Sequence, residues 1–230
     1  MLDWWREAGL DALVDEAPRH WLAEPKVAAE RPARAESAPT KPVAAPTALP
    51  ATLAAFNAWR VSEVAPDFGW GNVRIGPMGD AASDVMIMVE APERDDESAG
   101  HLLAGAPGIL FDRMLAAIGK SRDSILLASL AVTRPLAGRL PPDAFDDLAR
   151  IARHHLGLVA PKALLLMGNA PSRAVLGADV ALARGSSHVV NHGGATIRTV
   201  ATFHPRFLLE RPAAKGEAWR DLQLLMGRNA

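Results

Sequence analysis

Cysteine is absent from this chain of 230 residues. Its absence excludes disulfide bonds, metal sites built on thiolates and a cysteine nucleophile. Long apolar runs are missing as well, because no stretch approaches the roughly eighteen residues that a membrane-spanning helix needs. The first residues, Met-Leu-Asp-Trp-Trp-Arg-Glu, have neither the basic region nor the apolar region of a secretory signal. We therefore expect a cytoplasmic protein without a membrane partner.

The chain also lacks a strong excess of charge of either sign. Its formal net charge of −1 excludes a uniformly basic nucleic-acid-binding protein, although it allows a local basic patch. Charges of opposite sign are segregated along the sequence. Residues 84–100 hold six acidic side chains and one arginine, a net charge of −5, whereas residues 184–230 hold seven basic and three acidic side chains, a net charge of +4.

The N-terminal part of the chain divides into two segments by composition. Residues 1–24 are amphipathic and rich in tryptophan, and residues 3–17 are predicted to be helical, with Trp4 and Leu10 near one face. Residues 25–51 contain six prolines among alanines and charged residues, so they are predicted to be a disordered linker. A tryptophan-rich segment on such a tether indicates a docking motif for a protein partner. The alternative is that the segment folds back on its own domain.

From residue 52 to residue 230, predicted helices and strands alternate. Apolar runs predict strands at 84–90, 124–132, 162–167 and 197–203, and helical spacing predicts helices between them. An acidic loop is expected at 93–100 and another loop at 204–212. This alternation predicts a single α/β domain with three layers, α/β/α, around a central, mostly parallel, four-stranded sheet.

Four of the predicted strands would bring Glu90, Ser129, Gly168 and His204 to one edge of the sheet. Ligands of open α/β sheets bind at the carboxyl edge. His204 ends its strand because Pro205 lacks a backbone donor, and a histidine there can donate a hydrogen bond near neutral pH. The alternative for His204 is a strand-end histidine that is satisfied locally and has no function.

The segment after His204 carries apolar side chains between arginines. Phe207 and Leu208 are flanked by Arg206 and Arg211. An apolar tip between cations suits a wedge that enters a stacked DNA duplex while the arginines hold phosphates. The alternative is an ordinary solvated pair of arginines.

Six short motifs, in this order along the chain, resemble those of one family. They are Val89-Glu90-Ala91-Pro92-Glu93, Gly100-His101-Leu102-Leu103-Ala104-Gly105, the run from Ala128 to Leu136, Pro161-Lys162 to Met167-Gly168, Arg184-Gly185 and the run from His204 to Pro212, and Trp219-Arg220-Asp221-Leu222 resembles the family's terminal helix. From residue 52 to residue 226 the chain is similar to the uracil-DNA glycosylase superfamily, most closely its bacterial iron–sulfur class. The first motif of that class usually reads Gly-Glu-Ala-Pro-Gly.

The resemblance implies base excision from DNA and assigns roles to residues of this chain. Glu90 would orient a water and face the cationic sugar, and His204 would stabilise the departing base. Ala91, Leu103 and Ser129 match substrate-binding positions. Leu208 matches the wedge position, and DNA is the expected partner, with a base flipped into the pocket.

Departures from the family are equally informative. The four cysteines that hold its cluster are matched by Phe56, Trp59, Thr133 and Asp147, so we expect no cluster, no metal and no other cofactor. We expect the rings of Phe56 and Trp59 to fill the vacated volume.

Two base-handling positions change as well. Leu103 replaces the aromatic that stacks on the flipped base, and Ser129 replaces the asparagine that reads its edge. We therefore expect weak or redirected excision of uracil or a related damaged base.

Two other classes of function compete with this enzyme. A non-catalytic DNA-binding or adaptor protein of the same fold is favoured by the changes at Leu103 and Ser129, whereas retention of Glu90 and His204 favours the enzyme. An unrelated nucleotide-binding enzyme would need a glycine-rich phosphate loop, and the sequence contains neither Gly-x-x-x-x-Gly-Lys nor Gly-x-Gly-x-x-Gly.

Overall fold

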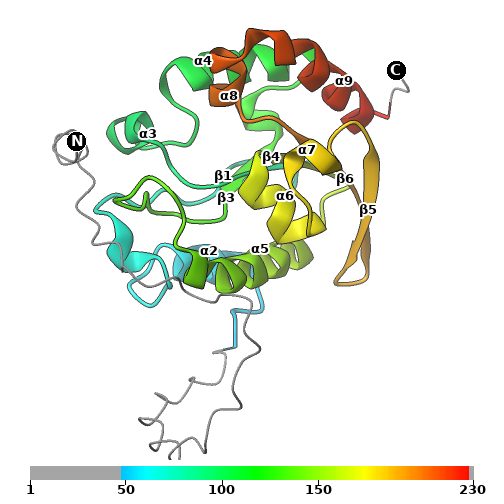
Figure 1. Ribbon diagram of the computed structural model, residues 1–230. Coiled ribbons are helices and arrows are strands. Elements are labelled where there is room, and N and C mark those ends of the chain that lie inside the picture. Colours follow the sequence, from blue (N-terminus) through cyan, green and yellow to red (C-terminus); the bar gives the residue numbers. More distant parts are fainter. Residues whose placement is uncertain (1–47, 228–230) are drawn as a thin grey trace, which may run out of the picture. The chain divides into compact units, whose positions relative to one another are not determined.

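A computed structural model of the chain describes residues 48–227 (Figure 1). The tryptophan-rich segment 1–24 and nearly all of the predicted linker 25–51 lie outside the described residues, so their structure remains a prediction. Among residues 48–227, no helix has the length and apolar character to cross a membrane.

A six-stranded sheet runs through the domain in the order β1-β3-β2-β4-β6-β5. The four central strands are parallel, namely β3 (Leu126–Ser129), β2 (Val85–Val89), β4 (Ala163–Met167) and β6 (Ala195–Thr202). The edge strands β1 (Met78–Gly79) and β5 (Ser187–His192) pair antiparallel to their neighbours. The α/β prediction is confirmed, but the predicted four strands become six. β1 is too short to give a sequence signal, and the alternating polar residues of β5 do not form the apolar run that predicted the other strands.

Helices cover both faces of the sheet, as the three-layer prediction required (Figure 1). Alternate residues of β2 point to opposite faces, so Ile87 and Val89 join one apolar cluster while Met86 and Met88 join the other. The first cluster packs under α4 (Gly105–Ala117) and α9 (Lys215–Leu225), and the second under α5 (Phe145–Val159) and α6 (Asn169–Leu176). The remaining helical elements are α2 (Leu53–Arg60), η1 (Phe68–Trp70), α3 (Arg94–Ala99), η2 (Arg122–Ser124), η3 (Pro142–Ala144), α7 (Val180–Ala183), α8 (Pro205–Glu210) and η4 (Pro212–Ala214).

The predicted acidic loop at 93–100 is instead the helix α3. Its start is a reciprocal capping box, in which the carboxylates of Glu93 and Asp96 each accept a backbone N–H of the other's position. Asp96 is buried, and its second oxygen accepts the N–H of Ala104 at 2.6 Å. Gly100, with φ of 72°, ends the helix. The acidic run therefore stabilises its own helix and joins it to the start of α4.

The predicted loop at 204–212 is also largely helical. His204 is the N-cap of α8, and Pro205 occupies its first turn, where a missing backbone donor costs nothing. A helix in this segment has an inner and an outer face, which a loop does not. Helix α8 packs its inner face against α4.

Candidate active site

A cavity of about 490 Å³ lies at the carboxyl edge of the parallel strands. Glu90 and Ala91 reach it from the end of β2, Gly168 from the end of β4, and His204 from the end of β6. The register of the parallel pairs puts these strand ends at the same edge. The structure thus brings Glu90 and His204 to one cavity, as the strand-end pattern predicted.

His204 is held as a neutral ring with one defined donor. Its Nδ1 accepts the backbone N–H of Arg206 at 3.3 Å, so the proton of the neutral ring resides on Nε2. Burial and, to a lesser extent, the charge of Arg206 lower the pKa of His204 to about 4, and Asp96 opposes this shift. At neutral pH the side chain therefore offers an Nε2–H group without a positive charge.

Glu90 is a partly buried carboxylate at the tip of β2. Its backbone carbonyl accepts the N–H of Ala131, which extends the pairing of β2 with β3 by one residue. Burial raises the pKa of Glu90, while the backbone N–H of Leu140 and the charge of Arg206 lower it. The result is a carboxylate within the cavity that a hydrogen-bond donor and a nearby cation hold in place.

Glu93 adds a second carboxylate that the usual family motif does not have, because glycine occupies that position there. Its Oε2 forms an ion pair with the guanidinium of Arg206 at 2.7 Å, and its Oε1 lies 3.8 Å from Nδ1 of His204. Burial raises the pKa of Glu93, and Arg206 is the main opposing influence. Glu93 thus ties the start of α3 to the start of α8 across the wall of the cavity.

Two of the predicted substrate-binding residues do not line this cavity. The side chain of Leu103 is buried, with 2% exposed, and faces a separate cavity of about 470 Å³ bounded by Met78 and Gly79. Its carbonyl accepts the guanidinium of Arg122 at 2.6 Å, which fixes the backbone at φ of 53°. The hydroxyl of Ser129 is buried and has no hydrogen-bond partner within residues 48–227. Ala91 is the only member of the predicted trio at the cavity wall.

The predicted DNA-binding residues lie in different surroundings along and after α8. Arg206 and Phe207 line the cavity, and Arg206 is about half exposed at 52%. Arg211 follows the helix and lies over the Phe207 ring, 5.6 Å from its centroid. Leu208 is buried, with 1% exposed, because α8 turns it to the inner face. The expectation of an exposed apolar tip at Leu208 therefore does not hold in this structure.

Sequence reasoning did not single out four further residues of the cavity wall. Phe203 precedes His204, and its ring lies 4.7 Å from that of Phe207. Asn169 follows Gly168, and its side-chain oxygen accepts the N–H of Val180, so its amide N–H groups are left as donors. Arg134 and Arg139 come from the loop after β3. Phe203 and Asn169 are the sequence neighbours of His204 and Gly168, which were predicted from the ends of their strands. Considering one more residue on each side of those strand ends would have included both.

The positions that match the cluster cysteines do not fit an iron–sulfur cluster. None of Phe56, Trp59, Thr133 and Asp147 carries a thiolate, and Asp147 lies exposed on α5. No group of three or more histidine and acidic side chains within residues 48–227 is placed to hold a metal ion. No step of the chemistry is therefore assigned to a cluster.

Aromatic packing occupies part of this region. The Phe56 ring is 1% exposed and lies 4.8 Å from the ring of His155 and 5.8 Å from that of Trp59. Burial lowers the pKa of His155 to about 4, helped by the charges of Arg60 and His154. The expectation that large rings pack here agrees with the buried position of Phe56.

A buried ion pair lies beside these rings. Arg60 holds both carboxylate oxygens of Asp67, one of them at 3.1 Å, and also donates to the carbonyl of Leu130. Asp67 in turn accepts the N–H of Val132 at 2.6 Å, and its carbonyl accepts the hydroxyl of Thr133. This network, which we call the Arg60–Asp67 staple, fixes the chain that leaves β3 toward the cavity.

Comparisons with known proteins identify relatives of this chain. The Type-4 uracil-DNA glycosylase of Archaeoglobus fulgidus is 24% identical over 153 residues, covering 64% of this chain and 77% of the relative. That of Pyrobaculum aerophilum is 24% identical over 156 residues, covering 65% and 80%. That of Sulfurisphaera tokodaii is 23% identical over 140 residues, covering 56% and 63%. A family model described as the Uracil DNA glycosylase superfamily matches residues 77–223, and the chain belongs to this superfamily.

Proposed function

We propose that the protein hydrolyses the N-glycosidic bond of uracil or a related damaged base in DNA. The observation that carries the proposal is the convergence of Glu90 and neutral His204 on one cavity at the carboxyl edge of the sheet. The names of its relatives, Type-4 uracil-DNA glycosylases, support the same chemistry. The target nucleotide would leave the base stack and enter the cavity.

His204 is assigned to the leaving base. When the bond between the sugar C1′ and the base nitrogen breaks, its electron pair goes to the base, and negative charge gathers on the base carbonyl oxygens. The Nε2–H of His204 would donate to one of these oxygens. A neutral donor suits this task because its hydrogen bond strengthens as the base becomes an anion, so the gain is largest in the transition state.

Glu90 is assigned to the sugar and the water. Its negative charge would stabilise the cationic C1′ that bond breaking leaves, and it would accept a hydrogen bond from the attacking water. The water oxygen bonds to C1′, and its proton passes through the carboxylate to solvent or to the base anion. The N–H of Leu140 would keep the carboxylate turned toward this task.

Base recognition would differ from that in the resembled class, because Leu103 and Ser129 lie away from the cavity. We assign edge reading to the amide N–H groups of Asn169 and stacking to the ring of Phe203. An amide that only donates favours bases with carbonyl oxygens, among them uracil, hypoxanthine and xanthine. The specificity is accordingly proposed to be weak for uracil or shifted to another of these lesions.

A second candidate is a non-catalytic DNA-binding or adaptor protein, and the buried, unpartnered hydroxyl of Ser129 favours it. In this version the cavity grips an extruded base without cleaving it. The tryptophan-rich segment 1–24, which lies outside the described residues, would recruit a protein partner.

A cleavage assay separates the two candidates. Single-stranded oligonucleotides carrying uracil, hypoxanthine or xanthine are incubated with the full chain, and abasic sites are revealed by alkali on a gel. The double variant Glu90→Gln, His204→Ala serves as the control for contaminating glycosylases. Release of a base by the wild type alone supports the enzyme. Binding to the same oligonucleotides without any release supports the adaptor.

A further inference from the structure

The loop between β3 and η3, residues 133–141, exposes one large apolar side chain. Leu136 is 95% exposed, more than any other large apolar residue of the described chain. Full exposure of a leucine forgoes the free energy that its burial would provide. Its neighbours Arg134, Pro135 and Arg139 all line the cavity of Glu90 and His204. Leu136 therefore projects into solvent beside the mouth of that cavity.

A tight turn holds Leu136 in this position. The N–H of Gly138 donates to the carbonyl of Pro135 at 2.8 Å, so Leu136 and Ala137 occupy the two central positions of the turn. Gly138 has φ of 69°, which favours glycine, and Pro135 itself is buried. The apolar tip is thus a defined feature of the turn.

Both ends of the loop are anchored to functional parts of the domain. At its start, Thr133 is fully buried and its hydroxyl donates to Asp67 of the Arg60–Asp67 staple. Near its end, the backbone N–H of Leu140 lies close enough to Glu90 to lower the pKa of its carboxyl group. The loop that carries the tip is therefore anchored in the core at Thr133 and passes beside Glu90 at Leu140.

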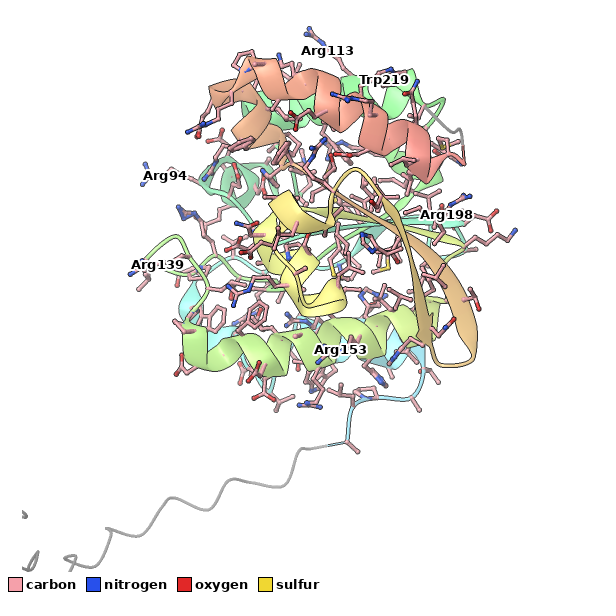
Figure 2. The ribbon with its side chains drawn as sticks, turned by 45° about the vertical axis from the view of Figure 1, so that its right-hand side comes forward. Arg94, Arg113, Arg139, Arg153, Arg198 and Trp219 are labelled. Atoms are coloured by element: carbon pink, nitrogen blue, oxygen red, sulfur yellow. The ribbon has the colours of Figure 1, made fainter. Side chains whose placement is uncertain are left out.

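Two cations flank the tip. Within residues 48–227 neither Arg134 nor Arg139 forms an ion pair, and Arg134 only lowers the pKa of the nearby Glu93, which is paired with Arg206. Figure 2 shows Arg139 reaching from its loop into solvent. Unpaired guanidinium groups beside an apolar tip match the needs of a duplex, whose phosphates flank its stacked bases.

We propose that Leu136 is a wedge residue that enters the base stack of duplex DNA beside the extruded nucleotide, while Arg134 and Arg139 bind the neighbouring phosphates. The proposal rests on the proposed function and extends it to the duplex form of the substrate. It also supplies the exposed wedge that Leu208, buried on the inner face of α8, does not provide. Insertion of an apolar side chain compensates for the stacking that the flipped base loses.

The test compares duplex and single-stranded substrates of one sequence carrying the same lesion. Leu136→Ala should lower base release from the duplex about ten-fold or more, because unstacking one base step costs at least as much free energy as a ten-fold change in rate. Release from the single strand should stay within about two-fold, since no stack has to be opened there. Leu136→Phe, which keeps a large apolar side chain, should retain most of the wild-type activity on the duplex.

Val189→Ala is the matched control, because Val189 is also an exposed apolar residue (64%) but lies on the edge strand β5 and lines neither cavity. It should change neither activity. An equal loss on both substrates with Leu136→Ala, or no loss on the duplex, would overturn the proposal.

A second readout separates failure of the wedge from failure of the proposed function. A duplex with a fluorescent base analogue beside the lesion brightens when stacking is lost, whether or not the glycosidic bond is cleaved. Wild type should brighten it and Leu136→Ala should not, even if no base is ever released. Brightening that is equal for both proteins would exclude Leu136 as the wedge, whereas absence of release alone would contradict only the enzymatic assignment.

Discussion

At the carboxyl edge of the sheet, Glu90, Glu93 and His204 are partly buried with shifted pKa values. Beside the positions that match the cluster cysteines, Arg60 and Asp67 are fully buried and satisfied by each other and by backbone groups. The first arrangement leaves polar side chains facing the cavity, and the second leaves none facing it. The charges of Arg60 and Asp67 instead hold parts of the chain together. A change in this second region can therefore replace one stabilising device by another while the cavity keeps its groups.

The largest expected effect is a loss of stability when the Arg60–Asp67 staple is broken. Asp67→Ala leaves the guanidinium of Arg60 buried without its carboxylate and removes the acceptor of the Val132 N–H. We expect the free energy of unfolding to fall by about 3–5 kcal/mol. Urea denaturation followed by circular dichroism measures this loss.

Asp147→Ala is the matched control, because it removes the same carboxylate from a position that matches a cluster cysteine but is exposed on α5. Its effect should stay within about 0.5 kcal/mol. Equal effects of the two substitutions would show that the staple contributes no more than a surface charge.

The next prediction concerns the catalytic side. His204→Ala and Glu90→Gln should each lower base release by roughly 10²–10³-fold, because each removes a group placed for charge that develops in the transition state. Neither should lower the melting temperature appreciably, since Glu90 is held at some desolvation cost and His204 caps only a six-residue helix. Single-turnover kinetics and thermal melts of the same samples test both statements. A large fall in melting temperature would assign these residues a structural role.

His155 provides a pH-dependent test of the region at the cluster positions. Its pKa in the folded chain is about 4 against a usual 6.5, so the unfolded chain binds its proton first as the pH falls. The stability that neutral His155 contributes is complete above about pH 6.5 and is lost progressively toward pH 4. The loss is on the order of 3 kcal/mol.

His155→Phe keeps the ring stack with Phe56 and removes the titration. Its unfolding free energy should therefore vary less with pH than that of the wild type between pH 4 and 6.5. Denaturation curves at three pH values measure the difference between the two proteins. Glu90 and Glu93, whose pKa values are raised, titrate alike in both, so they cancel from the comparison. Parallel pH profiles would contradict the assignment of a neutral, buried His155.

The smallest expected effect is a change in DNA affinity when the Glu93–Arg206 ion pair is broken. Glu93→Gln removes the carboxylate that holds Arg206 and frees this half-exposed guanidinium for a phosphate. DNA affinity should rise a few-fold, and the slope of log affinity against log salt should steepen by up to about one unit. Fluorescence anisotropy at several salt concentrations measures both. Glu210→Gln makes the same change of charge at the cavity wall without an ion pair to break within residues 48–227, and should have the weaker effect.

Much of the fold was predictable because the central strands are continuous apolar stretches of the sequence. Val85–Val89 is buried on both faces, and its end delivers Glu90 to the sheet edge as expected. The helices α3 and α8 were not predicted, because six residues give little periodicity. Their stability comes from caps, such as the reciprocal bonds of Glu93 and Asp96, that become visible only when the chain is folded.

The parts of the site that sequence reasoning placed differently depend on contacts far apart in the chain. Leu103 is buried away from the cavity of Glu90 and His204, and its carbonyl accepts a hydrogen bond from Arg122, nineteen residues away. Leu208 is buried because α8 is a helix packed on α4. Leu136 gave no signal of its own, since an exposed leucine in a loop cannot be told from a buried one until the packing around it is known.

The Arg60–Asp67 staple and the rings beside it are built without a metal ion or a thiolate. An iron–sulfur cluster is dismantled when oxidants attack its metal or its thiolates, and this region presents neither. The chain supplies every atom of the staple itself, so folding here does not wait for iron or sulfide to be delivered. The staple therefore makes the folding of this region independent of the redox state of its surroundings.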